Sequence, residues 1–132
     1  ARGARAPLTI FRKLKTDANG RIDLKMHGLF PLVAGARVLA IKHGIRARAT
    51  SERLQGLIDL ELVDAGEGAA LIAAHRTILT AMLQQQLKDG EQGIALSSRV
   101  APETLSERLL TDVTRAVTAV STMNDLVSEG RF

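Results

Sequence analysis

The charged and amide side chains that could do chemistry cluster near predicted helix ends. Cations held on a rigid frame can bind phosphates or an acidic partner, and neighbouring carboxylates and amides can hydrogen-bond a substrate. Each residue also has a common structural role, because a carboxylate near a helix start offsets the helix dipole and an Arg on a bundle helix usually pairs with a Glu. Seven residues are candidates for contacting a substrate or another domain: Asp23, Lys25, Arg37, Thr50, Glu52, Arg53 and Gln86.

No spacing in the chain is typical of a catalytic or metal centre. His27, His43 and His75 have no Cys partners and no HExxH pattern, so a metal site could form only by tertiary assembly. His75 falls on an apolar helix stripe and is expected to be a hydrogen-bonded core residue. The chain also lacks the Gly-Ser followed by Asp-x-Asp with which polymerase-β-like transferases hold two magnesium ions. We therefore predict no metal site and no catalysis by this chain alone.

Basic residues are concentrated in the first part of the chain. Residues 1–50 carry eleven Lys and Arg and two acids, a net charge of +9, whereas residues 51–132 have a net charge of −5. This asymmetry suggests an anionic ligand or an acidic neighbouring domain facing the first third. A solvated basic face is the alternative.

The composition argues against several protein classes. There is no Cys, which excludes disulfides and favours a cytoplasmic location. The three aromatic residues, all Phe, and the lack of a helix-turn-helix pattern argue against nucleic-acid binding. The longest charge-free run is shorter than the roughly 18 residues of a membrane span, so we expect no membrane association. A chain of 132 residues that is 45% hydrophobic is expected to be one folded domain.

The start of the chain predicts an extended entry segment or a short β-hairpin at residues 7–25. Leu8–Lys15 alternates apolar and polar residues and could pair with Arg21–Leu24 across the turn Thr16–Gly20. The chain begins with neither Met nor a signal sequence, so we expect a piece excised from a longer multidomain protein. Residues 29–132 then form the helical part of this single domain.

From Leu29 onward the apolar period is helical and predicts an all-α, up-and-down bundle of four to five helices. Pro31 suits a first turn and Gly44 a C′ position, and Thr50 is the expected N-cap of a helix over Ser51–Val63. A third helix is expected over Glu67–Lys88, stopped by Asp89-Gly90, with a loop over Gly90–Ala101. Pro102 and a capping box at Thr104-Leu-Ser-Glu107 then introduce the last helix, to Val127.

Several short motifs follow one another along the chain: Gly20-Arg-Ile-Asp-Leu-Lys25, Gly28-Leu-Phe-Pro31, Ala36-Arg-Val-Leu-Ala40, Gly44-Ile45, Thr50-Ser-Glu-Arg-Leu54, Gln84-Gln-Gln86-Leu87 and Leu105-Ser-Glu-Arg-Leu109. In this order they resemble the putative nucleotidyltransferase substrate-binding domain. This is the C-terminal helical module of bacterial signal-transduction proteins that also carry cyclic-nucleotide-binding, CBS and nucleotidyltransferase domains. A more distant likeness reaches the helical domain of PII uridylyltransferase and glutamine synthetase adenylyltransferase.

The resemblance implies a function as well as a fold. The module would pack against an upstream nucleotidyltransferase domain and position a protein acceptor or the base and ribose of a nucleotide. Mg and a nucleoside triphosphate would belong to that missing domain, and this fragment would bind no cofactor of its own. The seven candidate residues would be ligand or interface groups.

A competing hypothesis is a non-catalytic bundle that forms a homodimer or relays signals from cyclic-nucleotide or CBS sensor domains. A large exposed apolar patch on a helix would favour it.

Overall fold

A computed structural model describes residues 16–130, and within them the predicted all-α bundle is confirmed. The four α-helices are α2 (Phe30–Lys42), α3 (Thr50–Asp59), α4 (Ala65–Glu91) and α5 (Glu107–Ser128). A five-residue π-helical turn, η1 (Lys25–Leu29), leads into α2, and a 3₁₀ turn, η2 (Pro102–Thr104), precedes α5. Two short strands, β1 (Ile22–Asp23) and β2 (Arg99–Val100), complete the described elements.

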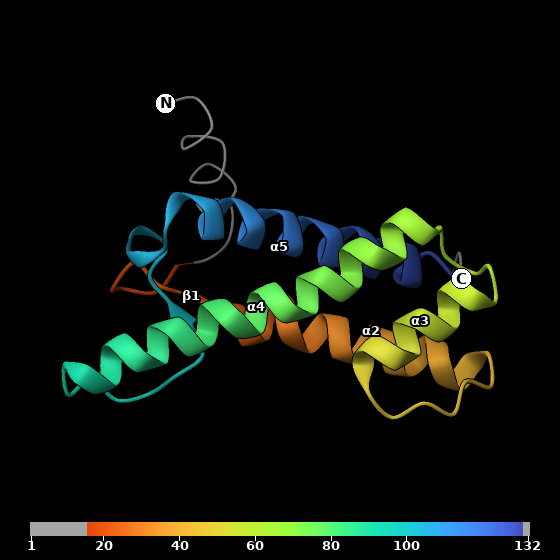
Figure 1. The fold of residues 1–132 in the computed structure, drawn as a ribbon, viewed down its shortest axis with the longest axis horizontal. Coiled ribbons are helices and arrows are strands. Elements are labelled where there is room, and N and C mark those ends of the chain that lie inside the picture. The colour runs from red at the N-terminus through yellow and green to blue at the C-terminus, as the bar shows by residue number, and fades with distance from the viewer. Residues whose placement is uncertain (1–15, 131–132) are drawn as a thin grey trace.

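Helix α4 is the longest of the described elements. Its 27 residues make it about 40 Å long at 1.5 Å per residue. It runs diagonally across the view in Figure 1, with α5 packed along it and α3 packed against it, while α2 packs against α3 and α5. The core between these helices is apolar, and its largest fully buried hydrophobic side chains are Ile22, Leu24, Leu32, Leu54, Ile78, Val100, Val113 and Val120.

The chain reverses between α2 and α3 through an extended segment. Gly44 has φ +71° and its N–H donates to Ile41 O, so the predicted helix end there is confirmed. Residues 45–47 then lie along α3, because Ile45 lies against Gly56 and Arg53 Nε donates to Ala47 O at 2.8 Å. As a result α3 runs in the same general direction as α2 in Figure 1, whereas α4 runs in the opposite direction.

The predicted ends of three helices differ from those observed. Thr50 is the first residue of α3 and not its cap, because the N-cap position is Ala49, and α3 ends at Asp59, before Val63. The last helix is capped by Ser106, which accepts from Leu109 N, while Thr104 belongs to η2. Helix α4 continues past Asp89-Gly90 to Glu91. Asp89 is buried inside the protein, where it accepts hydrogen bonds from Arg21 and Gln85, and therefore does not end the helix.

The small sheet joins two distant parts of the chain. Strand β1 pairs antiparallel with β2, with Ile22 opposite Val100 and Asp23 opposite Arg99. Strand β2 lies in the segment predicted to be a loop, which had no strand signal of its own. The predicted turn is present, since Asp17 N donates to Arg21 O at 2.8 Å, whereas Leu8–Lys15 lies outside the described residues.

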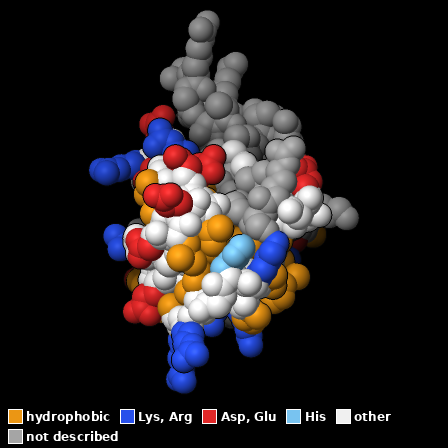
Figure 2. All heavy atoms as spheres, turned by 90° about the vertical axis from the view of Figure 1, so that its right-hand side faces the viewer, with side chains coloured by type: hydrophobic (Ala, Val, Ile, Leu, Met, Phe, Trp, Pro, Cys, Tyr) orange, Lys and Arg blue, Asp and Glu red, His pale blue; other side chains and the backbone are white. Residues whose placement is uncertain are grey.

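The surface mixes hydrophobic and charged groups. Figure 2 shows the end of the molecule at which α2 connects to α3 and α3 to α4, with hydrophobic side chains in the centre, Lys and Arg below and several acids to one side. Within residues 16–130, no helix combines the length and apolar character that crossing a membrane requires.

Candidate functional site

A buried ion pair links the turn before β1 to the last turns of α4. Arg21 Nη1 donates to Asp89 Oδ2 at 2.7 Å, and Arg21 Nη2 donates to Asp89 Oδ1 at 2.9 Å. The Asp89 side chain is 2% exposed and that of Arg21 is 18% exposed. Two parallel N–H···O bonds hold both planar groups in one geometry, so this pair fixes the turn against the helix.

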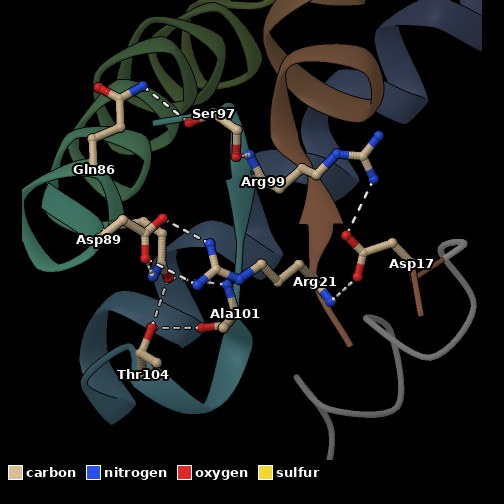
Figure 3. A network of polar contacts seen from close by, with 9 residues as sticks. Asp17, Arg21, Gln86, Asp89, Ser97, Arg99, Ala101 and Thr104 are labelled. Atoms are coloured by element: carbon tan, nitrogen blue, oxygen red, sulfur yellow. Dashed lines mark hydrogen bonds and ion pairs between the residues drawn. The ribbon is translucent and has the colours of Figure 1, made fainter. Parts of the chain in front are cut away.

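Gln85 extends this pair into a network, and Figure 3 labels the members Arg21, Asp89, Ala101 and Thr104. Its amide Nε2 donates to Asp89 Oδ1 at 3.0 Å, and its Oε1 accepts from Ala101 N at 3.0 Å and from Thr104 Oγ1 at 2.9 Å. Gln85 is 2% exposed, so these bonds replace the water that its amide has lost. Through Gln85, α4 holds the chain between β2 and α5.

Asp17 organises the turn that carries Arg21. Its Oδ1 accepts from the N–H groups of Asn19 and Arg21, both at 2.9 Å, and its Oδ2 accepts from Arg99 Nη1 at 3.2 Å. The Arg99 side chain is 48% exposed, so this second ion pair is open to water and weak. Figure 3 shows Asp17 between the two arginines.

A groove of about 480 Å³ opens beside this network. This volume is within the range of small-molecule sites. Its lining mixes charges of both signs with hydroxyl, amide and small apolar groups, so it offers both hydrogen-bond donors and acceptors. The groove is lined by Asp17, Asn19, Arg21, Ile94, Ala95, Ser97, Arg99, Ala101 and Glu103. We call it the sheet-end groove.

Three of the seven predicted residues lie at this end of the molecule. Asp23 Oδ1 accepts from Ser98 Oγ at 2.7 Å and from the main-chain N–H groups of Lys25 and Met26. Gln86 Nε2 donates to Ser97 O at 3.0 Å. Asp23 and Gln86 therefore hold the strand-like segment next to the groove, and Lys25 is exposed at the start of η1.

The other four predicted residues lie elsewhere. Arg37 is exposed in the middle of α2 and has no ion pair within residues 16–130. Thr50, Glu52 and Arg53 lie in the first turn of α3, which Figure 1 places well away from β1. The structure therefore brings Asp23, Lys25 and Gln86 together and leaves Arg37 and the α3 residues in the α2–α3 half. Their role in binding a substrate or a domain stays a prediction.

Sequence reasoning missed the residues of the network and of the groove, namely Arg21, Gln85, Asp89 and Arg99. One signal was present: Gln85 and Asp89 continue the core-facing spacing of Ile78 on α4, and polar residues on an apolar stripe need buried partners. The pair Asp89-Gly90 instead predicts a helix stop. Arg99 had no local signal because its partners come from the other end of the chain.

The network lowers the pKa values of the carboxyl groups that take part in it. Hydrogen bonding from Arg21 holds the pKa of Asp89 below its usual value, and the main-chain N–H of Arg21 does the same for the pKa of Asp17. Burial raises the pKa of Asp23, but the bonds from Ser98, Met26 and Lys25 outweigh it, so this pKa is also lowered. All three carboxylates are therefore ionised at neutral pH.

None of the three histidines lines the sheet-end groove. His75 is half-buried on α4, and the described part of the chain provides its side chain with no hydrogen bond, contrary to the prediction. His43 Nε2 is buried without a partner at the end of α2. In residues 16–130 no three His, Asp or Glu side chains converge on a point where a metal ion could bind.

Comparison with known proteins gives one match. A family model described as "Putative nucleotidyltransferase substrate binding domain" matches residues 1–130. No curated protein and no solved structure matches the chain.

Proposed function

The chain belongs to the putative nucleotidyltransferase substrate-binding domain family, and from that membership we propose that it positions a substrate for a nucleotidyltransferase domain upstream in the same protein. The upstream domain supplies Mg, the nucleoside triphosphate and the catalytic carboxylates, and this chain does no chemistry alone. We further propose that the whole protein is a cytoplasmic bacterial signal-transduction protein.

The sheet-end groove is the observation that carries this proposal. It lies on a frame held by the Arg21–Asp89 pair and by Gln85, so its shape is set before a ligand arrives. Preorganised groups lose little entropy on binding, which is what a module that positions a substrate requires. Its volume of about 480 Å³ exceeds the roughly 290 Å³ of the hollow between α4 and α5 and of the one beside η1.

The lining favours the base and ribose of a nucleotide over its phosphates. Arg99 and Asn19 can donate hydrogen bonds, while Asp17 and Glu103 can accept them from base or ribose groups. Ile94 and Ala95 provide an apolar surface for a planar ring. The two carboxylates offset the two arginines, so the groove does not attract a polyanion. The phosphates would therefore point out of the groove, toward the transferase domain.

Isothermal titration of the 132-residue chain with ATP, GTP and UTP, each with magnesium, tests this role. We expect weak binding of at least one nucleotide, and binding of the matching nucleoside with similar affinity. Arg99→Ala should weaken it by about tenfold, the value of roughly one charged hydrogen bond. Arg48→Ala, which removes an exposed Arg outside the groove, is the matched control.

The same titration evaluates the residues predicted from sequence alone. If Lys25→Ala or Arg37→Ala weakens nucleotide binding while Arg99→Ala leaves the affinity unchanged, the binding site lies outside the groove. If no nucleotide or nucleoside produces heat, the substrate-binding role fails, and packing against the transferase domain is the part of the proposal that survives.

A second function, as a protein interaction bundle, is favoured by one observation. Several large apolar side chains on α4 and the loop after it are exposed, among them Leu83 at 57% and Leu87 at 62%. Such groups on one helix are typical of an interface.

A further inference from the structure

Helix α4 carries an apolar stripe on the side that faces away from the core. Leu79, Leu83 and Leu87 follow one another at intervals of four residues, and their exposed fractions are 42%, 57% and 62%. Residues spaced in this way lie along one face of a helix, here over about 12 Å. We call these three residues the α4 outer stripe. Single exposed leucines are common, but an unbroken row on one helix is not.

The loop after α4 extends this apolar surface. Leu96 is 63% exposed and lies against Gly90, where a Cβ atom would be 3.9 Å from Leu96 Cδ2. Ile94 is 43% exposed in the same loop. The apolar surface therefore continues beyond Leu87 to the end of α4.

The charges at the two ends of the stripe have opposite signs. Arg76 lies one turn before Leu79, and Glu91 lies one turn after Leu87; both residues are exposed. Neither side chain forms an ion pair or a hydrogen bond with another residue of the described range 16–130. The face thus has an apolar middle, one cation and one anion.

We propose that two copies of the chain form a two-fold symmetric dimer in which the α4 outer stripes pack against each other, antiparallel, with Leu83 on the symmetry axis. In that register a residue before Leu83 lies opposite the residue equally far after it in the partner. Leu79 therefore meets Leu87, and Arg76 lies beside Gly90 and within reach of Glu91. The Leu79–Leu87 contact and the Arg76–Glu91 ion pair each occur twice, as a closed isologous interface requires.

The charges at the ends of the stripe favour a second copy of the chain as the partner, and they favour the antiparallel orientation. A parallel pairing would place Arg76 beside Arg76 and Glu91 beside Glu91, and like charges side by side in an interface cost several kcal/mol. The dimer can be tested apart from the nucleotide site: Ile94 borders both surfaces, but the residues changed in the dimer tests, Arg76, Leu83 and Glu91, line no part of the sheet-end groove.

Sedimentation velocity of the 132-residue chain at increasing concentration tests the dimer. We expect a monomer–dimer equilibrium that Leu83→Glu shifts to monomer, with a dissociation constant at least about a hundredfold higher, because two carboxylates then meet on the axis. Leu60→Glu changes a side chain that is 53% exposed in the α3–α4 connection, and should leave the dimer unchanged. A monomer at every concentration, or a dimer insensitive to Leu83→Glu, would overturn the proposal.

A charge exchange tests the antiparallel register itself. Arg76→Glu and Glu91→Arg should each weaken the dimer, whereas the double variant should recover most of the lost affinity. A non-specific apolar contact would show no recovery, and that result would refute the register. Circular dichroism checks that each variant keeps its helices. Nucleotide titration of Leu83→Glu should match the unaltered chain, so failure of the dimer and failure of the proposed substrate role give separate readouts.

Discussion

Arg21 and Asp89 form a two-pronged ion pair, with N···O distances of 2.7 and 2.9 Å, although 68 residues separate them in the chain. The pair fastens the turn before β1 to the last turns of α4. It therefore positions one wall of the sheet-end groove, and both the stability and the shape of that end depend on it.

Removing one member of this pair should cost more than removing the pair. Asp89→Ala leaves the Arg21 guanidinium without its counter-charge in a mostly buried place, whereas Arg21→Met with Asp89→Leu leaves no unpaired charge. We expect the double variant to unfold at a higher urea concentration than Asp89→Ala alone. Arg99→Ala is the exposed-pair control and should change stability by at most about 1 kcal/mol. A double variant less stable than Asp89→Ala would contradict this account.

Acid should destabilise the fold through the same carboxyl groups. In the unfolded chain these carboxyl groups have their usual pKa of 3.8. In the folded protein the pKa values of Asp89, Asp17 and Asp23 are lower than that. The unfolded state then binds more protons as pH falls, and the stability that is full above pH 3.8 decreases as pH falls through the folded-state pKa values. Urea unfolding at a series of pH values measures this slope.

The Arg21→Met/Asp89→Leu variant provides the control for the acid effect. It lacks the Asp89 carboxyl, so its stability should fall less steeply between neutral pH and pH 3. Equal slopes in the two proteins would show that Asp89 does not contribute.

Gln85→Leu should destabilise the chain by about 1–3 kcal/mol, because Ala101 N then has no acceptor in a buried place. The control is Gln84→Leu, which changes the preceding, exposed residue of the same helix and should have little effect. Thermal unfolding followed by circular dichroism compares the two. If the two variants melt together, the Gln85 bonds contribute nothing.

Two glycines in α4 should respond in opposite directions to the same substitution. A Cβ at Gly68 would lie 2.4 Å from Ile58 Cγ1, so Gly68→Ala should push α3 away and cost about 1–3 kcal/mol. A Cβ at Gly90 meets nothing closer than 3.9 Å, so Gly90→Ala should stabilise the helix by about 0.5–1 kcal/mol. Urea unfolding measures both, and a loss of stability at both positions would contradict the packing at Gly90.

Local patterns in the sequence were enough to predict most of the helices. Apolar spacing, Pro31 and Gly44 predicted α2 and its end, because a helix depends on contacts among residues three or four positions apart. The same patterns failed at Thr50 and Thr104, where a serine or threonine suited a cap but a neighbouring residue occupied that position. The family match also followed from motif order along the chain.

What the amino-acid sequence determined by itself was therefore the helical class, the family and the absence of local catalytic motifs. Only the tertiary structure decided that β1 pairs with β2, that Arg21 reaches Asp89, and that Arg99 and Asp17 share a groove. The reason is physical: a helix is stabilised by near neighbours, which the sequence displays, whereas the partner of a buried charge is chosen by the packing of the whole core. The spacing of Gln85 and Asp89 along α4 predicts that both face the core, but it does not show which side chains they contact there.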